Sequence, residues 1–253
     1  LANVDQNEPM TAAQIYATYV NSTVGTTTEI DTNVFGQVVQ TAASGSGFII
    51  SQNGYIVTNY HVINDANAIK VTLYDGTSYL ATLVGGDEEN DIAVLKIEAT
   101  GLTPVVIGSS DELVVGEPVY AIGNPLGELT FSLTGGYVSA LNRNVTMSDG
   151  RRMNYIQTDT AINSGNSGGA LFNQYGQVVG IVSAKLSSSG SSTSASVEGI
   201  GFAIPIDDVK DMITDLIQYG YITGQPYMGI INQTVSSEAQ WYGTPAGAYV
   251  RGV

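Results

Sequence analysis

A seven-residue segment at 163–169, with the sequence NSGNSGG, places Ser167 among glycines and small polar residues. Glycine allows backbone conformations that other residues rarely adopt, so such a loop can turn several amide N–H groups toward one point. A serine nucleophile with an oxyanion hole needs that arrangement. A tight turn between two strands would explain the same glycines, so the segment alone leaves both interpretations open.

A serine hydroxyl is a poor nucleophile without a neighbouring base, and the chain holds one histidine, His61. This residue lies in the segment TNYHVI at 58–63, directly after a run rich in β-forming residues. A lone histidine can also be an ordinary surface or core side chain. Its role therefore depends on what lies beside it in the fold.

A buried carboxylate would complete this set by holding the imidazole in one tautomer. Asp91 is the best candidate, because it begins the segment DIAVLKI at 91–97, and an apolar strand would draw it inward. An aspartate that caps the same strand at the surface is the alternative. Spacing alone leaves Asp65, Asp75 and Asp87 as rivals.

The composition excludes several other chemistries. The 253 residues include no cysteine, which excludes disulfides, thiolate metal sites and cysteine nucleophiles, and a single histidine excludes a histidine-rich metal site. We therefore expect neither a metal nor a cofactor. Eight Lys and Arg against 23 Asp and Glu give a net charge of −15, which should repel nucleic acids and anionic lipid surfaces. No apolar run approaches the length of a membrane-spanning helix.

Most of the elements that must position these residues are short strands. Thr11 and Gln14 first form a capping-box pattern, which predicts a helix that runs to about Asn21. Turn residues then separate strand-like runs at a spacing that favours β-barrels or sandwiches over βαβ units. The predicted strands are 48–50, 55–58, 69–73, 80–84, 93–97, 119–122, 136–141, 154–158, 170–172, 178–183 and 201–205.

An apolar stripe near the end of this region predicts a second helix over 207–219. Asp207 or Asp208 should cap its first turn, and Gly220 should end it. The simplest role for this helix is to pack on the barrels.

Segments spread along the chain resemble, in the same order, the HtrA/Deg family of serine proteases. The similarity covers roughly residues 11–224, and it selects Asp91 over its rivals. It implies an all-β fold with two six-stranded antiparallel β-barrels in the chymotrypsin arrangement, flanked by an N-terminal and a C-terminal helix. The matching segments are TAASGSGFII (41–50), TNYHV (58–62), NDIAVLK (90–96), GNPLG (123–127), TGGYVSA (134–140), IQTDTAINSGNSGGAL (156–171) and GIGFAIP (199–205).

The resemblance assigns roles by motif. Ser167 would attack the scissile carbonyl, His61 would act as general base and then general acid, and Asp91 would orient the imidazolium. The backbone around Gly165, Asn166 and Ser167 would form the oxyanion hole. Where the family often has proline, this chain has a serine at 164, which leaves the loop freer in φ and the hole less often preformed.

Substrate selection follows from the same resemblance. The pocket for the residue before the cut would be lined by Ile162 and by Ala184, Lys185 and Leu186. Because Ile162 and Leu186 are apolar, a small aliphatic side chain should be preferred. The alternative is that both residues simply fill the core.

Three loops match regulatory loops of the family. The segment 142–152, with Arg151 and Arg152 near its end, matches a sensor loop that reads activating signals. The segments 124–130 and 187–198 match loops that must become ordered together with the oxyanion hole. Each could instead be a plain surface loop.

The domain organisation has three parts. Residues 1–10 are expected to be a flexible N-terminus, 11–223 the protease domain, and 224–253 a partial PDZ domain. The tail resembles the first PDZ strands, with Tyr227–Ile230 as the loop that grips a peptide C-terminus. A fragment of this size cannot bury a core of its own.

The residues that could form a triad and the resemblance to the HtrA/Deg family together imply an ATP-independent serine endopeptidase that cleaves unfolded or misfolded proteins. The resemblance implies a bacterial, extracytoplasmic homotrimer in protein quality control, secreted or anchored through a segment before residue 1, with C-terminal peptides as possible activators. The alternative is a non-catalytic peptide-binding or chaperone module on the same fold. That alternative predicts the loss of one triad residue, and none is lost.

Overall fold

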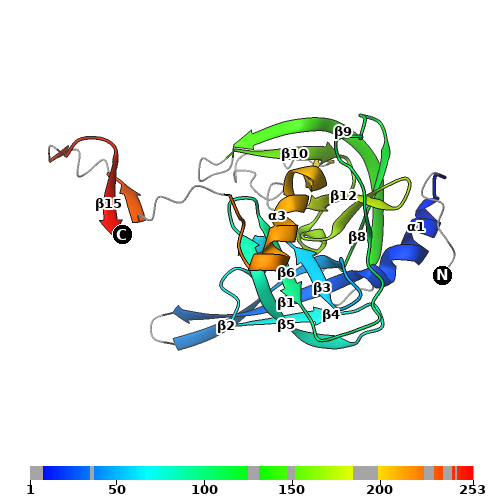
Figure 1. Cartoon of the computed structure of the whole chain (residues 1–253), viewed down its shortest axis with the longest axis horizontal. Helices are drawn as coiled ribbons and strands as arrows, with labels where there is room; N and C mark the ends of the chain where they lie inside the picture. Colours follow the sequence, from blue (N-terminus) through cyan, green and yellow to red (C-terminus); the bar gives the residue numbers. More distant parts are fainter. Residues whose placement is uncertain are drawn as a thin grey trace. The chain divides into compact units, whose positions relative to one another are not determined.

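The computed structural model describes residues 8–34, 37–124, 131–146, 152–184, 199–224, 231–235, 241–242 and 244–252. The chain divides into two compact units, residues 1–221 and residues 222–253 (Figure 1). Within the described ranges, no helix is both long enough and apolar enough to cross a membrane.

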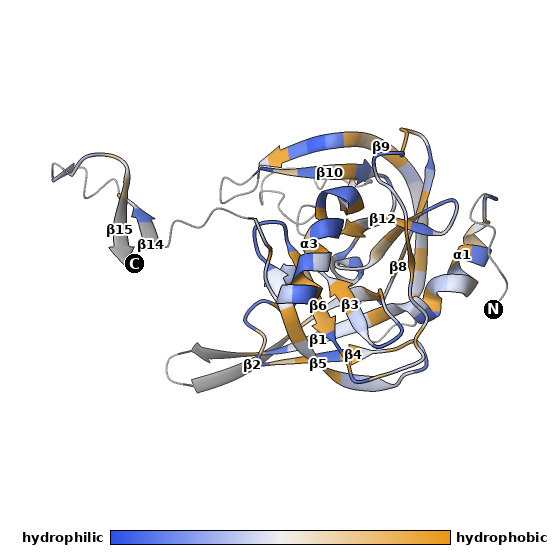
Figure 2. Cartoon of the chain, in the orientation of Figure 1, coloured by the Kyte–Doolittle hydropathy of each residue, from blue (hydrophilic) through white to orange (hydrophobic). Residues whose placement is uncertain are grey.

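Six antiparallel strands of the first half close into a barrel in the order β1-β2-β3-β6-β5-β4. Its interior is filled by aliphatic side chains such as Val24, Ile56 and Leu95, all fully buried. Figure 2 shows this hydrophobic content on β3 and β6. The strands are β1 Thr23–Val34, β2 Gln37–Ile49, β3 Tyr55–Thr58, β4 Ala68–Thr72, β5 Ser78–Asp87 and β6 Ile92–Lys96.

The second half forms a second barrel in the order β11-β8-β9-β10-β13-β12, which the pairing of β11 with β12 closes. A short strand, β7 (Val106–Ile107), adds to β12 in parallel. The prediction of two six-stranded antiparallel barrels is therefore confirmed. The strands are β8 Pro118–Gly123, β9 Ser132–Thr146, β10 Arg152–Thr158, β11 Ala170–Asn173, β12 Gln177–Val182 and β13 Gly201–Pro205.

Several strands are longer than their apolar patterns predicted. Strand β9 has 15 residues and continues through Thr146, so the first five residues of the predicted loop 142–152 are strand. They pair with β10 across a bulge at which Asn142 takes the left-handed conformation, with φ of 53°. The prediction was wrong there because a solvent-facing hairpin arm needs no apolar alternation to pair its backbone.

The N-terminal helix α1 (Ala12–Tyr19) begins at the predicted capping box. Thr11 accepts a hydrogen bond from the Gln14 N–H, and the Gln14 side chain accepts one from the Thr11 N–H. A single 3₁₀ turn, η1 (Val20–Ser22), follows the helix. Tyr19 stacks on Phe172 of β11 with the ring centroids 5.0 Å apart, which fixes the helix on the second barrel.

The C-terminal helix α3 (Ile206–Tyr219) contacts β5 and β6 of the first barrel and β12 and β13 of the second (Figure 1). It ends at Gly220, in the left-handed conformation, as predicted. The predicted cap was wrong, because Pro205 is the N-cap and has no side-chain cap. Asp207 instead accepts hydrogen bonds from Ser109, Ser110 and the Asp111 N–H.

The last turn of α3 lies close against β5 of the first barrel. A side chain at Gly85 would collide with the backbone of Gly220 and with Leu216, so only glycine fits between the strand and the helix end. The two barrels are thus bridged by one helix whose end rests on the first barrel.

The second unit contains an antiparallel pair of strands, β14 (Ile231–Thr234) and β15 (Ala248–Gly252). The predicted peptide-gripping loop Tyr227–Ile230 lies outside the described residues. The assignment of this unit to a partial PDZ domain stays a prediction.

Candidate active site

His61 lies on a one-turn helix, α2 (Tyr60–Ile63), that follows β3 directly. The N-cap residue of this helix is Asn59, whose backbone is extended and whose side chain makes no capping hydrogen bond. The cap comes from another part of the chain, because the His61 N–H donates to Asp91 Oδ1 at 2.9 Å. This places His61 at the end of the first barrel, with a quarter of its side chain exposed.

Asp91 lies immediately before β6 in the left-handed conformation, with φ of 55°. Its side chain is buried, and its Oδ2 lies 2.8 Å from His61 Nδ1. The rival aspartates make local contacts instead: Asp87 binds Asn90, and Asp75 accepts from the Thr77 N–H. Asp65 accepts from the neighbouring Asn64 side chain.

Ser167 completes the set from the second barrel. Its Oγ lies 2.7 Å from His61 Nε2, and the residue is 2% exposed. The loop is held to the first barrel because the Ser46 N–H donates to the Ser167 carbonyl at 2.8 Å. Gly168, with φ of 85°, lies so close to Ser46 and Thr58 that a side chain would not fit.

The geometry assigns the proton positions. An ionised carboxylate only accepts hydrogen bonds, so the His61 Nδ1 that faces Asp91 carries the proton. His61 Nε2 then presents its lone pair to the Ser167 hydroxyl. The arrangement can therefore pass the serine proton to the imidazole while Asp91 stabilises the charge that results.

The predicted oxyanion-hole segment forms a 3₁₀ turn, η2 (Ser164–Asn166). The Gly165 N–H donates to Asn163 Oδ1 at 3.1 Å, and the Asn166 N–H donates to the Asn163 carbonyl at 3.0 Å. The Gly165 carbonyl accepts from Ser46 Oγ at 2.6 Å. In this conformation the Gly165 amide is therefore engaged inside the loop.

The structure places only some of the predicted pocket and loop residues. Ile162 is half-buried against the core of the second barrel, and the Ala184 N–H lies 3.4 Å from Ser167 Oγ. Arg152 is exposed at the start of β10, opposite Thr146. The remaining predicted residues, Arg151, Lys185 and Leu186, and the loops 125–130 and 187–198 lie outside the described residues.

Sequence reasoning missed one residue of the site. Asn59 is fully buried, and its side chain contacts both the Ser167 hydroxyl and the Asp91 carbonyl. An asparagine directly before a helix is expected to cap that helix. The local pattern therefore pointed away from the contacts that the side chain makes.

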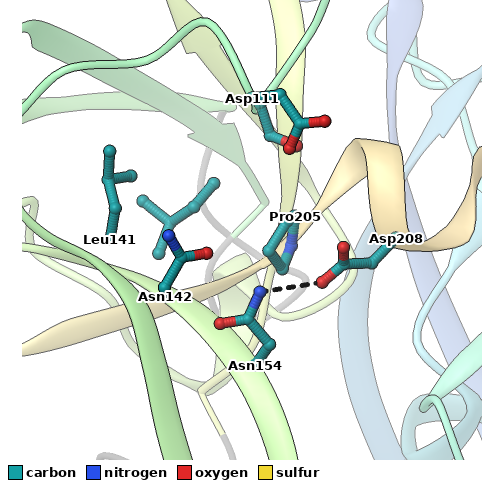
Figure 3. Close-up of a pocket in the computed structure, with 8 residues that line it drawn as sticks. Asp111, Leu141, Asn142, Asn154, Pro205 and Asp208 are labelled. Carbon is teal, nitrogen blue, oxygen red and sulfur yellow. Dashed lines mark hydrogen bonds between the residues drawn. The ribbon is translucent and has the colours of Figure 1, made fainter.

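A small polar pocket of about 80 Å³ lies apart from these residues, between the β9–β10 hairpin and the start of α3 (Figure 3). Asn154 Nδ2 donates to Asp208 there at 3.0 Å, and Asn142 and Asp111 face the same space. Among the described residues, no group of three or more His, Cys, Asp or Glu could hold a metal ion. The hydrogen bond between Asn154 and Asp208 links the hairpin to the helix, and the pocket is lined by none of the residues around Ser167.

Residues 45–181 match the family model described as a trypsin-like peptidase domain. The chain is 46% identical over 201 residues to a probable periplasmic serine endoprotease, DegP-like, of Chlamydia trachomatis. It is 48% identical over 197 residues to the serine protease Do-like HtrA of Bacillus subtilis. These alignments cover 78% and 75% of this chain but only 38% and 42% of the relatives, so the chain spans about two fifths of their length.

The fold is also similar to a solved structure. A variant of the HtrA-type protease AlgW with a decapeptide superposes with a TM-score of 0.77 at 32% sequence identity. The match covers 96% of this chain and 78% of that one.

Proposed function

This chain belongs to the trypsin-like peptidases of the HtrA/Deg type, and on that premise we propose that it is a serine endopeptidase with Ser167 as nucleophile. The observation that carries the proposal is the continuous chain of contacts from Ser167 Oγ through the imidazole of His61 to the carboxylate of Asp91. Two barrels supply these residues, so the site exists only when both are folded together.

In the proposed reaction, Ser167 Oγ attacks the scissile carbonyl while its proton passes to His61 Nε2. The tetrahedral intermediate collapses when the imidazolium gives that proton to the leaving amine, which breaks the peptide bond and leaves an acyl-serine. A water molecule then attacks the ester, and His61 again takes and returns one proton. Free Ser167 and a new carboxyl terminus result.

The proposed oxyanion hole needs a change in the loop at 163–166. A donor stabilises the intermediate only if it points at the developing oxyanion, and the Gly165 N–H is bonded to Asn163 instead. We assign the described conformation to a resting state. Substrate or an activator must release this amide before Gly165 and Ser167 can bind the oxyanion together.

Substrates and setting follow from the relatives by analogy. Unfolded or misfolded polypeptides are the proposed substrates. A preference for a small aliphatic residue before the cut is proposed from the resemblance, which assigns Ile162 to the pocket, and in the structure Ile162 packs against the core of the second barrel. Because one relative is named periplasmic, an extracytoplasmic location is proposed as well. A homotrimer and activation by C-terminal peptides complete the proposal, and the net charge of −15 argues against nucleic acid as a partner.

One experiment tests the activity against the non-catalytic alternative. A serine-directed phosphonate should label wild type at Ser167, casein should be cleaved, and His61→Ala should lose both reactions. Asp65→Ala, at an exposed aspartate of the same barrel, is the matched control and should keep both. A wild type that is neither labelled nor active, even with an activating peptide, would favour a peptide-binding module.

A further inference from the structure

We propose that Asn59 is a positioning residue that holds the Ser167 hydroxyl and the Asp91 backbone in register; this inference rests on the proposed peptidase function. Asn59 Oδ1 lies 3.1 Å from Ser167 Oγ, and Asn59 Nδ2 lies 2.9 Å from the Asp91 carbonyl oxygen. One amide thus bridges the nucleophile of the second barrel and the carboxylate segment of the first.

The orientation of this amide is fixed by chemistry. A carbonyl oxygen only accepts hydrogen bonds, so the group that faces the Asp91 carbonyl must be the Asn59 NH₂. Its oxygen then faces Ser167 Oγ and accepts from the hydroxyl. A flipped amide would oppose two oxygen atoms at the Asp91 carbonyl and is excluded.

An exchange of capping roles frees Asn59 for this bridge. Asn59 is the N-cap residue of α2, a position where asparagine usually binds an amide of the first turn. Here the Asp91 carboxylate takes the His61 N–H instead. Asp91 therefore caps α2 in place of its N-cap residue Asn59. Asn59 in return donates to the carbonyl of Asp91, a residue in the left-handed conformation with φ of 55°.

The bridge limits the positions that Ser167 Oγ can take. His61 Nε2 at 2.7 Å and Asn59 Oδ1 at 3.1 Å are both acceptors, and the hydroxyl has one proton to share between them. The third neighbour, the Ala184 N–H, is more distant at 3.4 Å. Without Asn59, the oxygen would keep only His61 and the distant Ala184 N–H, and it could rotate out of line with a bound carbonyl.

Burial distinguishes positioning from substrate binding. Asn59 is 0% exposed, so it cannot touch a polypeptide in the cleft. Its loss should therefore lower kcat and leave KM nearly unchanged, which is the pattern of an interaction that serves only the chemical step.

The test compares three variants of the full chain, with kcat expressed per phosphonate-titrated site so that a loss of folded protein cancels. Asn59→Ala should lower kcat about tenfold, and Asn59→Ser should lower it equally. Serine is a good N-cap and should keep the helix start, so Asn59→Ser carries the test if Asn59→Ala does not fold. Asn173→Ala removes another buried asparagine with three hydrogen bonds, at the end of β11 away from Ser167, and should keep kcat.

Wild-type kcat in Asn59→Ser, or a change confined to KM, would overturn the inference and leave the proposed function intact. An inactive and unlabelled wild type would overturn the proposed function and this inference with it. A tenfold lower kcat in both Asn59 variants, with KM within about twofold of wild type, would support the positioning role.

Discussion

The carboxylate of Asp91 binds the backbone and the ring of His61 at the same time. Asp91 Oδ1 accepts the His61 N–H at 2.9 Å, and Asp91 Oδ2 lies 2.8 Å from His61 Nδ1. One buried group therefore fixes the backbone position of His61, the orientation of its ring and the nitrogen that carries the proton. A loss of this carboxylate should affect both the local fold and the chemistry.

We expect Asp91→Asn to lower kcat/KM by about 10³- to 10⁴-fold while the chain still folds. The introduced amide can donate to His61 Nδ1, and the ring proton then moves to Nε2. A protonated Nε2 can no longer accept the proton of the Ser167 hydroxyl. Peptide-substrate kinetics with active-site titration measure the effect. Asp87→Asn, at the last residue of β5, is the control, and equal losses in both variants would contradict the assignment.

We expect Asn163→Ala to speed phosphonate labelling of resting enzyme by about two- to tenfold, the size of one neutral hydrogen bond. The substitution removes the acceptor that holds the Gly165 N–H inside the loop. Asn173 forms the same kind of turn with the Tyr175 N–H, so Asn173→Ala is the matched control. Slower labelling would mean that Asn163 supports the productive loop instead.

Asp207 should give the protein a pH-dependent share of its stability. Burial raises the pKa of this carboxyl, but hydrogen bonds from Lys210, the Asp111 N–H and Ser109 outweigh burial and bring it well below its usual range. Because the folded pKa is depressed, the stabilisation is present above the unfolded pKa of about 4 and is lost as pH falls through the folded value.

In urea unfolding, Asp207→Asn should therefore lower the free energy of unfolding by about 1.5–3 kcal/mol at pH 7. This difference between wild type and variant should become smaller below about pH 4. Asp211→Asn, at an exposed position of the same helix, should change the unfolding free energy by less than about 0.5 kcal/mol. A difference in unfolding free energy that stays constant down to about pH 3 would contradict the depressed pKa of Asp207.

Thr26→Val should raise the free energy of unfolding by about 1 kcal/mol. Thr26 is 1% exposed on β1, and its hydroxyl has no hydrogen-bond partner in the described part of the chain. Valine keeps the branched shape and removes the unsatisfied group. Thr28→Val on the same strand should instead lower the free energy of unfolding, because Thr28 Oγ1 donates to the Val62 carbonyl. Chemical unfolding that gives changes of the same sign for both variants would refute this account.

The residue pattern and the family resemblance together predicted the two barrels and three of the residues that meet at the site, His61, Asp91 and Ser167. Turn residues at short intervals and apolar runs such as β6 predicted β-barrels or sandwiches, and the family resemblance then selected two six-stranded barrels. The single histidine and the glycines around Ser167 left few possible partners. The choice of Asp91, however, rested on family resemblance, because a backbone conformation with φ of 55° leaves no mark in local spacing.

The features that were missed depend on partners distant in sequence. Asn59 is a helix cap by local pattern, yet its contacts lie 32 and 108 positions away at Asp91 and Ser167. Asp207 likewise looks like a cap until the turn at Ser109 supplies its donors. Propensity describes what a residue does for its own segment, and here tertiary contacts take precedence.

Because Gly85 of the first barrel lies against Gly220 at the end of α3, the first barrel is connected more directly than the second to the chain that follows the helix. The chain leaves α3 at the first barrel, beside the strand that pairs with β6, and Asp91 lies directly before β6. A pull on the chain beyond residue 220 therefore reaches the barrel of His61 and Asp91 before that of Ser167. A force on this part of the chain would act first on the barrel that holds His61 and Asp91, and it would reach Ser167 only through α3 and the contacts between the barrels.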